Sequence, residues 1–322
     1  MTTQVLYKLR QYAGDADLQA VCDFLNLCDA VDKLDDNYAP DDLGTEFASP
    51  ELDQKRDLRL WEDEEGRLVG FGQMWIPKEG DNLDGYLYLR VHPDVRGSGI
   101  EDSIFDWGSE RLREASRERE MPARLLSGTR DFHTYGLDVL KAHGMEPVRY
   151  WFKMERLLDE PMPEPVLPEG YTLTHMRGEE DIVPWVECFN QSFIDHWNHH
   201  PITVESHSHW LTDPKYRQEL DLRAVTPDGT VAAFCFCWID PESNERNNRS
   251  EGWIAELGTR RGHRKIGLGT ALLLAGMRKL KAEGIAKAML GVDAENPSGA
   301  LKLYESIGFR PVMTSITYSK EL

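Results

Sequence analysis

The sequence has few cysteines and no apolar run long enough to span a membrane. Its five cysteines are odd in number and lack the spacing of a metal site, which argues against a disulfide framework and fits reduced, buried thiols. No Gly-Lys-Ser or Gly-Lys-Thr occurs, so a phosphate loop of the P-loop type is excluded. The first residues show no signal-peptide pattern, and we therefore expect a soluble, cytoplasmic protein without membrane contacts.

Basic residues are also scarce relative to acidic ones. The chain has 37 Lys and Arg against 56 Asp and Glu, a net charge of −19. Nucleic-acid binding needs a basic surface, so this balance argues against a nucleic-acid partner and leaves cationic acceptors possible. The chain is 322 residues long, which predicts two domains.

One glycine-bearing loop stands out in the second half. Arg264 to Gly269 follows an apolar run and leads into a helix-forming segment, Thr270 to Ala282. The first backbone N–H groups of a helix have no partner within it, so such a loop favours an anion, above all a diphosphate. A dinucleotide fingerprint would need a small residue where Leu272 stands. What remains is the pattern Arg-x-x-Gly-x-Gly.

A second motif follows the strand predicted at Ala288 to Val292. Asn296 is suited to be an N-cap, Pro297 suits the first helical position, and Gly308 suits the residue just past the helix. The pattern predicts a short, well-delimited helix that carries Tyr304 on the same face as an alanine one turn earlier.

In this order and at this separation, the two motifs resemble those of the GNAT-type N-acetyltransferase superfamily. The resemblance implies an α/β fold with a mixed twisted sheet and helices on both faces. Two neighbouring parallel strands would splay apart, with the thioester of acetyl-CoA in the gap. It implies acetyl-CoA as the acyl donor and no metal. The residues expected to bind acetyl-CoA are Leu257, Gly258, Thr259, Arg264, Lys265, Ile266, Gly267, Leu268, Gly269, Thr270 and Asn296.

The chain repeats itself at a spacing near 165 residues, on either side of a proline-rich stretch. We expect a first GNAT-like domain at 1–159, a linker at 160–168 and a catalytic GNAT domain at 169–322. The first copy has diverged: its loop, Arg96 to Glu101, ends in a carboxylate, and Leu140 stands at the position of Tyr304. A negative side chain in an anion site lowers affinity, so we expect the first domain to bind acetyl-CoA weakly or not at all.

The catalytic candidates follow from the chemistry of acyl transfer to an amine. The resemblance places Tyr304 near the sulfur, as the group that protonates or hydrogen-bonds the leaving thiolate. The base stays open, because several family members hold a glutamate where this chain has Trp253. Glu256 would face the opposite side of the strand from Trp253 unless a bulge intervenes, and Glu251 and Asp293 are the other candidates.

Five of the ten histidines lie in the segment His196 to His209, which we expect to line the acceptor pocket. The sequence thus predicts an acetyl-CoA-dependent N-acetyltransferase that acts on the primary amine of a small molecule by direct attack. The tandem layout is similar to that of mycothiol synthases, which acetylate the amine of a cysteinyl pseudodisaccharide. A different cationic acceptor, a protein or peptide amine, and a non-catalytic acyl-CoA sensor stay open as alternatives. The oligomeric state is not indicated.

Overall fold

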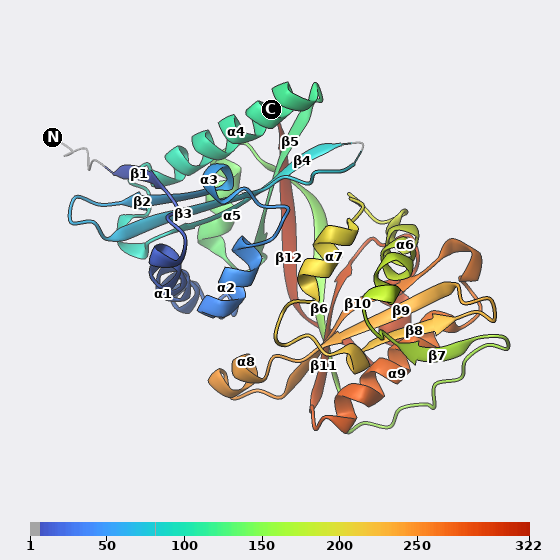
Figure 1. The fold of residues 1–322 in the computed structure, drawn as a ribbon. Coiled ribbons are helices and arrows are strands. Elements are labelled where there is room, and N and C mark those ends of the chain that lie inside the picture. Colours follow the sequence, from blue (N-terminus) through green and yellow to red (C-terminus); the bar gives the residue numbers. More distant parts are fainter. Residues whose placement is uncertain (1–6, 81) are drawn as a thin grey trace. The chain divides into compact units, whose positions relative to one another are not determined.

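The computed structural model describes residues 7–80 and 82–322 and divides the chain into two compact units (Figure 1). Unit 1 runs to Arg149 and also contains Ser315–Leu322, whereas unit 2 is Tyr150–Thr314. These limits differ from the expected domains at 1–159 and 169–322, because the chain leaves unit 1 inside strand β6 (Glu146–Leu157) and returns to it inside strand β12 (Arg310–Glu321).

Unit 1 has a sheet with strand order β1-β2-β3-β4-β5-β12. Helices cover both faces: one core lies between the sheet and α1 with α2, and another lies between the sheet and α4. The strands up to β5 are β1 (Lys8–Gln11), β2 (Leu58–Glu62), β3 (Leu68–Trp75), β4 (Leu83–Val91) and β5 (Ala123–Arg130). The helices are α1 (Asp15–Asp32), α2 (Pro40–Phe47), α3 (Gln54–Asp57), α4 (Ile100–Arg119) and α5 (Thr134–Ala142).

Unit 2 repeats this plan with the order β7-β8-β9-β10-β11-β6. Helix α6 packs on one face of its sheet and α9 on the other. The strands are β7 (Thr172–His175), β8 (Asp221–Val225), β9 (Val231–Trp238), β10 (Glu251–Thr259) and β11 (Lys287–Asp293). The helices are α6 (Ile182–Phe193), α7 (Val204–Trp210), α8 (Pro241–Arg246), α9 (Leu268–Ala282) and α10 (Ala300–Ser306). The mixed α/β fold expected from the sequence is therefore confirmed.

The two parallel strands at the centre of each sheet separate halfway along their length. In unit 2, β10 pairs with β11 only from Glu251 to Ile254. In unit 1, β4 pairs with β5 only from Leu83 to Tyr86. Beyond these points the two strands diverge, and among the described residues no strand pairs with the backbone edges that face the gap. Each unit thus has the open gap that the resemblance implies.

The last strand of each sheet comes from a distant part of the chain. Residues 315–321 of β12 pair antiparallel with β5 of unit 1, and residues 151–157 of β6 pair antiparallel with β11 of unit 2. The second half of β12 therefore completes the sheet of the first unit.

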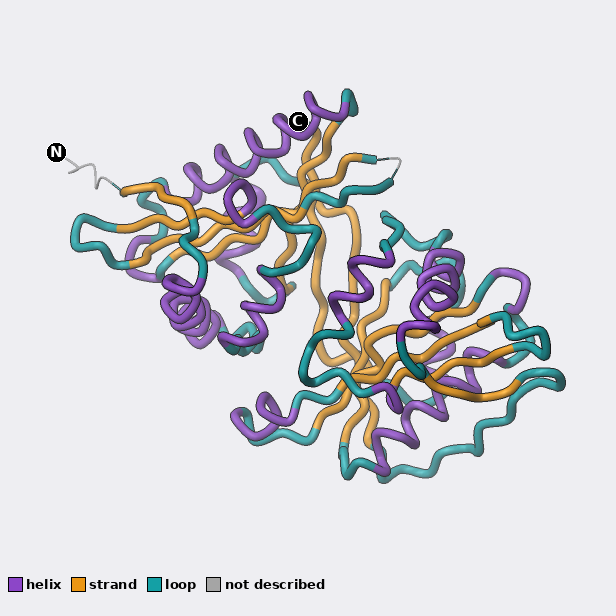
Figure 2. Tube along the Cα trace, in the orientation of Figure 1, coloured by secondary structure: helices purple, strands orange, loops and turns teal. Residues whose placement is uncertain are grey.

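The proline-rich stretch before β7 has no regular structure (Figure 2). It lies within unit 2, where the Arg278 guanidinium donates to the carbonyls of Met162 and Pro163 at 3.2 Å each. Leu167 packs against the core on the α9 face. This stretch is thus a packed surface segment of unit 2, and the crossing between the two units lies elsewhere.

The cysteines lie in the cores, as expected. All five are buried and free of disulfides. Cys235 and Cys237 face Gly276 of α9, where an added Cβ would come within 2.8 Å of either sulfur, so this glycine permits close packing of helix on sheet. Over the described residues, no helix has both the length and the apolar character needed to cross a membrane.

Candidate active site

The loop between β10 and α9 has the backbone geometry of an anion site. Lys265 and Gly267 both have positive φ angles, 63° and 91°, and the helix begins at Leu268. Its first helical hydrogen bond runs from the N–H of Ala271 to the carbonyl of Gly267 at 3.0 Å. The N–H groups of residues 268–270 precede that bond and are the donors that a helix start offers to an anion.

The same loop leaves room for a diphosphate. A Cβ added at Gly267 would meet nothing within 4 Å, and one added at Gly269 would meet only the Oγ1 of Thr259 at 3.5 Å and a leucine methyl at 3.9 Å. Gly267 is required by its backbone conformation, whereas Gly269 keeps the space above the helix start open. The residues present therefore fit the pyrophosphate of acetyl-CoA.

Arg264 holds this loop in place through contacts with protein groups. Its guanidinium donates to the carbonyl of Thr259 at 2.9 Å, to the carbonyl of Ser192 at 2.7 Å and to the carboxylate of Asp195 at 2.7 Å. Hydrogen bonds from Arg261 and Arg264 hold the pKa of Asp195 well below its usual range. Arg264 thus connects β10, the loop and the end of α6, and acts on the anion site by positioning it.

Strand β10 contains a β-bulge at Ala255. Before the bulge, Ile254 lies opposite Cys237 of β9, and after it Glu256 lies opposite Phe236. One extra residue in a strand reverses which face the following side chains point to. The side chain of Ala255 is exposed. Because of the bulge, Glu256 points to the face opposite the one it would have in a regular strand.

Two glycines of β10 confirm the reversal. Gly252 and Gly258 are an even number of residues apart and would share a face in a regular strand. A Cβ on Gly252 would instead lie 2.7 Å from a leucine of α9, and a Cβ on Gly258 would lie 2.9 Å from the Cβ of Ser192 in α6. Glu256 therefore lies on the α6 face, the same face as Trp253, at the point where β10 and β11 diverge.

Glu256 has the electrostatic properties of a general base. Its side chain is half-buried, and the burial raises its pKa to about 7. A base works best when its pKa lies near the working pH, because it then accepts a proton readily while a large fraction is still ionised. A carboxylate with this pKa beside the gap can take the proton of an ammonium group.

Tyr304 lies on α10, which packs on the α9 side of the sheet. It is buried, with its ring 6.1 Å from that of Phe309. Burial raises the pKa of its hydroxyl, and the charges of Cys235 and Glu256 raise it further. The hydroxyl therefore stays protonated at neutral pH and can donate a hydrogen bond.

The other two candidate carboxylates, Glu251 and Asp293, contact neighbouring protein groups. Glu251 is five residues before Glu256, about 17 Å away along an extended strand, and its carboxylate lies 3.8 Å from the guanidinium of Arg249. Asp293 is buried, and its Oδ1 accepts the N–H of Glu295 at 2.9 Å, which shapes the turn after β11. Neither lies at the point where β10 and β11 diverge on the α6 face, as Glu256 does.

The helix of the second motif begins later than the sequence predicts. Helix α10 starts at Ala300, and its N-cap is Gly299 with a φ of 80°, so the N-cap expected at Asn296 and the helix start expected at Pro297 are wrong. Asn296 instead accepts the N–H of Ser298 on its Oδ1 at 2.9 Å, an Asx turn. Gly308, with a φ of 96°, follows the end of the helix as predicted.

Next to Glu256, the α6 face of the sheet has an uncovered region at Gly291. Gly291 of β11 lies opposite Lys153 of β6, and a Cβ added at Gly291 would meet nothing within 4 Å. Their chain neighbours Leu290 and Met154 belong to the core on the α9 side, so Gly291 and Lys153 face the α6 side. The Lys153 ammonium lies 5.1 Å from the ring centre of Trp253. The space for an acceptor is thus bounded by Gly291 and by the indole of Trp253, with the charged groups of Glu256 and Lys153 beside it.

The histidine-rich segment divides into two environments. His207 is buried and stacked on Trp185, with ring centres 4.0 Å apart, and burial lowers its pKa to about 4, so it is a neutral core residue. The ring of His196 lies 5.7 Å from that of Trp151, which also contacts Trp197. Within residues 7–80 and 82–322, no three His, Cys, Asp or Glu side chains are grouped so as to hold a metal ion.

Comparisons with known proteins agree with this geometry. Residues 180–309 match the Acetyltransferase (GNAT) family. A mycothiol acetyltransferase of Streptomyces scabiei (strain 87.22) is 30% identical over 79% of this chain and 77% of its own length. That of Streptomyces bingchenggensis (strain BCW-1) is 28% identical over 93% of this chain and 92% of its own length. The crystal structure of a GCN5-related N-acetyltransferase from Sphaerobacter thermophilus superimposes with a TM-score of 0.74 at 25% identity, over 98% and 95% of the two chains.

The fold and the site define an acyltransferase of the GNAT type. The chain belongs to the GNAT acetyltransferase family, in the tandem arrangement that resembles the mycothiol acetyltransferases. It is an acetyl-CoA-dependent enzyme that transfers the acetyl group to the amine of a small molecule, as the sequence predicts.

Proposed function

We propose that unit 2 carries out the reaction with Glu256 as the general base and Tyr304 as the donor to the leaving thiolate. Glu256 takes a proton from the acceptor ammonium, and the neutral amine attacks the carbonyl carbon of the thioester. The carbon–sulfur bond then breaks and the thiolate leaves. The second proton of the attacking nitrogen passes to the thiolate, either directly or through the Tyr304 hydroxyl that hydrogen-bonds the sulfur. The products are the acetamide and free CoA.

The backbone of unit 2 provides the rest of the site. The N–H groups that start α9, at residues 268–270, bind the diphosphate, with Gly269 leaving space for it. No strand of the described part of the chain pairs with the β11-facing edge of residues 256–259 in β10, so an N–H on this edge can polarise the thioester carbonyl. In this proposal Asn296 contributes through the turn that precedes α10.

For the acceptor, we infer a mycothiol-type molecule, in which the amine belongs to a cysteinyl pseudodisaccharide. The mycothiol acetyltransferases among the relatives support this inference. So does the face beside Glu256, since Trp253 offers an indole surface against which a sugar ring can pack, with open space above Gly291. His196 and Trp197 extend this wall around Trp151.

The bulge at Ala255 is the observation that carries the proposal, because it turns a carboxylate with a pKa of about 7 toward the acceptor face. The test measures CoA release from acetyl-CoA across a panel of amines that includes the cysteinyl pseudodisaccharide, simple amino sugars and polyamines. We expect the pseudodisaccharide to have the highest kcat/KM. Saturable acetyl-CoA binding without turnover of any amine would favour a sensor instead.

A matched pair of variants separates Glu256 from a general effect of charge. We expect Glu256→Gln to lower kcat by about 10²- to 10⁴-fold, the usual contribution of a general base. Glu251→Gln removes a carboxylate from the same strand and should leave kcat within about twofold, since that group lies about 17 Å along the strand. Equal losses in both variants would contradict the assignment of the base.

A further inference from the structure

The diverged loop of unit 1 keeps the backbone geometry of the working loop of unit 2. Gly97 and Gly99 have φ angles of 75° and 96°, close to those of Lys265 and Gly267. Helix α4 starts directly after Gly99, as α9 starts after Gly267. The first unit therefore still forms an anion site at a helix start, even though its sequence has changed.

A carboxylate of the same chain fills this site. Glu101 is only 6% exposed, and its Oε1 accepts the N–H of Gly97 and the hydroxyl of Tyr135, each at 2.8 Å. The guanidinium of Arg96 lies over the ring of Tyr135, 4.0 Å from its centre. The loop, the helix start and α5 are joined through this one carboxylate.

Unit 2 has glycines at both corresponding positions. Aligning the two loops places Gly269 at the position of Glu101, and aligning α5 with α10 on Gly144 and Gly308 places Gly299 at the position of Tyr135. The two units thus differ in whether the anion site is filled by a side chain or left open for a ligand.

We propose that Glu101 is a tethered anion that takes the place of the cofactor diphosphate, with Tyr135 as its latch, so that unit 1 is closed to acetyl-CoA and the chain binds a single CoA. The carboxylate accepts the N–H of Gly97, the counterpart of Lys265 in the loop expected to bind the diphosphate, and keeps the loop ordered without a ligand. The inference rests on the proposed function in one respect, that the loop of unit 2 binds the diphosphate.

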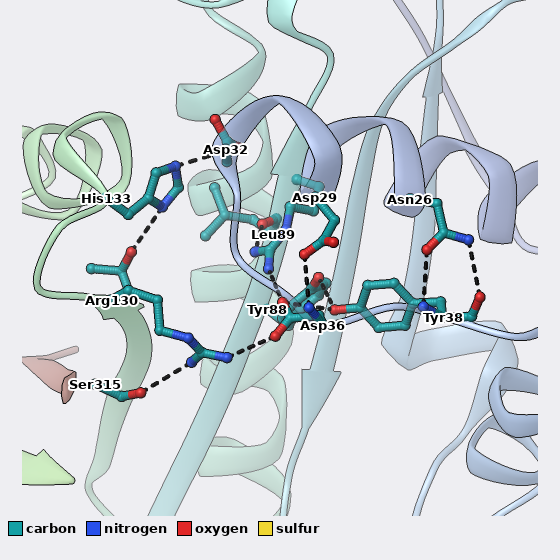
Figure 3. A network of polar contacts seen from close by, with 12 residues as sticks. Asn26, Asp29, Asp32, Asp36, Tyr38, Tyr88, Leu89, Arg130, His133 and Ser315 are labelled. Carbon is teal, nitrogen blue, oxygen red and sulfur yellow. Dashed lines mark hydrogen bonds and ion pairs between the residues drawn. The ribbon is translucent and has the colours of Figure 1, made fainter. Parts of the chain in front are cut away.

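The residues around the gap between β4 and β5 in unit 1 also differ from those around the gap in unit 2. Figure 3 shows Arg130 pointing to Asp36 and His133 pointing to Asp32 in this region. Arg130 donates to Asp36 at 2.7 Å, Arg90 donates to the same carboxylate at 3.0 Å, and His133 lies 3.3 Å from Asp32. Tyr88 stands in β4 at the position of Glu256 in β10, and the β3–β4 register shows no bulge. Unit 1 therefore lacks a counterpart of the base as well.

The test counts CoA binding sites by isothermal titration of the full-length protein with CoA. We expect the wild type to bind one CoA per chain and Gly269→Glu, which transplants the carboxylate into unit 2, to bind none. A Cβ at residue 269 makes only ordinary contacts, so this variant should fold. In the Gly269→Glu background, adding Glu101→Gly and Tyr135→Ala should restore saturable binding of one CoA.

Glu101→Gln is the matched control. Its amide oxygen can accept the same two hydrogen bonds, so we expect unit 1 to stay closed in the Gly269→Glu background. Binding of CoA by this control would mean that charge repulsion alone closes the site, and it would overturn the proposal. Two CoA molecules on the wild type, or no binding by the opened variant when its thermal unfolding is cooperative, would overturn it as well.

Activity separates this inference from the proposed function. If Gly269→Glu keeps both CoA binding and turnover, the loop of unit 2 is not the diphosphate site, and the proposed function fails. If Gly269→Glu loses turnover but still binds one CoA, that CoA lies in unit 1, and the role of Glu101 as an occupying anion is wrong.

Discussion

Glu256 and Tyr304 have complementary protonation states at neutral pH. Burial raises the pKa values of both groups, which keeps the phenol protonated and brings the carboxylate to a pKa of about 7. One residue is therefore ready to accept a proton and the other to donate a hydrogen bond. The sequence predicts Tyr304 as the donor to the thiolate, because the second motif surrounds it. It could not choose among Glu251, Glu256 and Asp293, since the choice depends on burial and on strand phase.

Removing the phenol oxygen tests the role of Tyr304. We expect Tyr304→Phe to lower kcat by about 10- to 100-fold, less than loss of the base, because a thiolate is a good leaving group and needs only modest assistance. The KM for acetyl-CoA should change little, since the diphosphate contacts are on α9. Steady-state kinetics would check this, and undiminished kcat would remove Tyr304 from the mechanism.

At the scale of the element, the bulge in β10 sets which face of the sheet Glu256 points to. Nothing in the sequence around Ala255 predicts the bulge, because alanine also occurs in regular strands. The loop and α9 were predictable from glycine positions and helix periodicity. The start of α10 was not, because asparagine suits both an N-cap and an Asx turn, and the left-handed Gly299 placed the helix start after the turn.

Deleting the bulge residue should abolish catalysis while unit 1 stays folded. Removal of Ala255 makes the side chains of β10 alternate regularly between the two faces of the sheet. Either Glu256 or the residues before it then point to the face opposite their present one. We expect kcat to fall at least as far as in Glu256→Gln. Ala255→Gly keeps the residue count and is the control, with kcat expected within about threefold because a glycine in a strand weakens it only moderately. Full activity in the deletion variant would contradict the role of the bulge.

The diphosphate loop gives a second prediction at this scale. Gly267→Ala places a Cβ on a residue with a φ of 91°, which we expect to destabilise the loop by about 1–2 kcal/mol and to weaken CoA binding by about tenfold. Lys265→Gly, at a φ of 63°, relieves rather than introduces strain and should preserve binding. Titration calorimetry with CoA measures both, and equal affinities in the two variants would argue against strain as the cause.

At the scale of the whole molecule, the two units share strands. Residues 315–321 of β12 complete unit 1, and β6, which follows β5 and α5 in the chain, completes unit 2. Local sequence patterns predict that both segments are strands but contain no information on which distant edge they pair with. The duplication itself was visible as a repeat, whereas the exchange of strands needed the structure.

Truncation after Thr314 tests this exchange. Loss of β12 from unit 1 exposes the edge of β5 and removes Tyr318 from the core, so we expect unit 1 to unfold or become rapidly cleaved in limited proteolysis. The exposed-site variant Glu321→Ala should change the free energy of unfolding by less than about 0.5 kcal/mol. A truncated chain whose first unit resists proteolysis as the full chain does would contradict the pairing of β12 with β5.

The pH dependence of kcat/KM for the best acceptor, in the wild type and in Glu256→Gln, tests the central claim most directly. Because only the carboxylate form is a base, the wild-type value should rise as the pH increases through about 7. In Glu256→Gln that limb should vanish and the value at pH 8 should fall by about 10²-fold or more. The variant should unfold no more easily at pH 8, since burial favours the uncharged side chain. An unchanged pH limb and rate in Glu256→Gln would contradict Glu256 as the base.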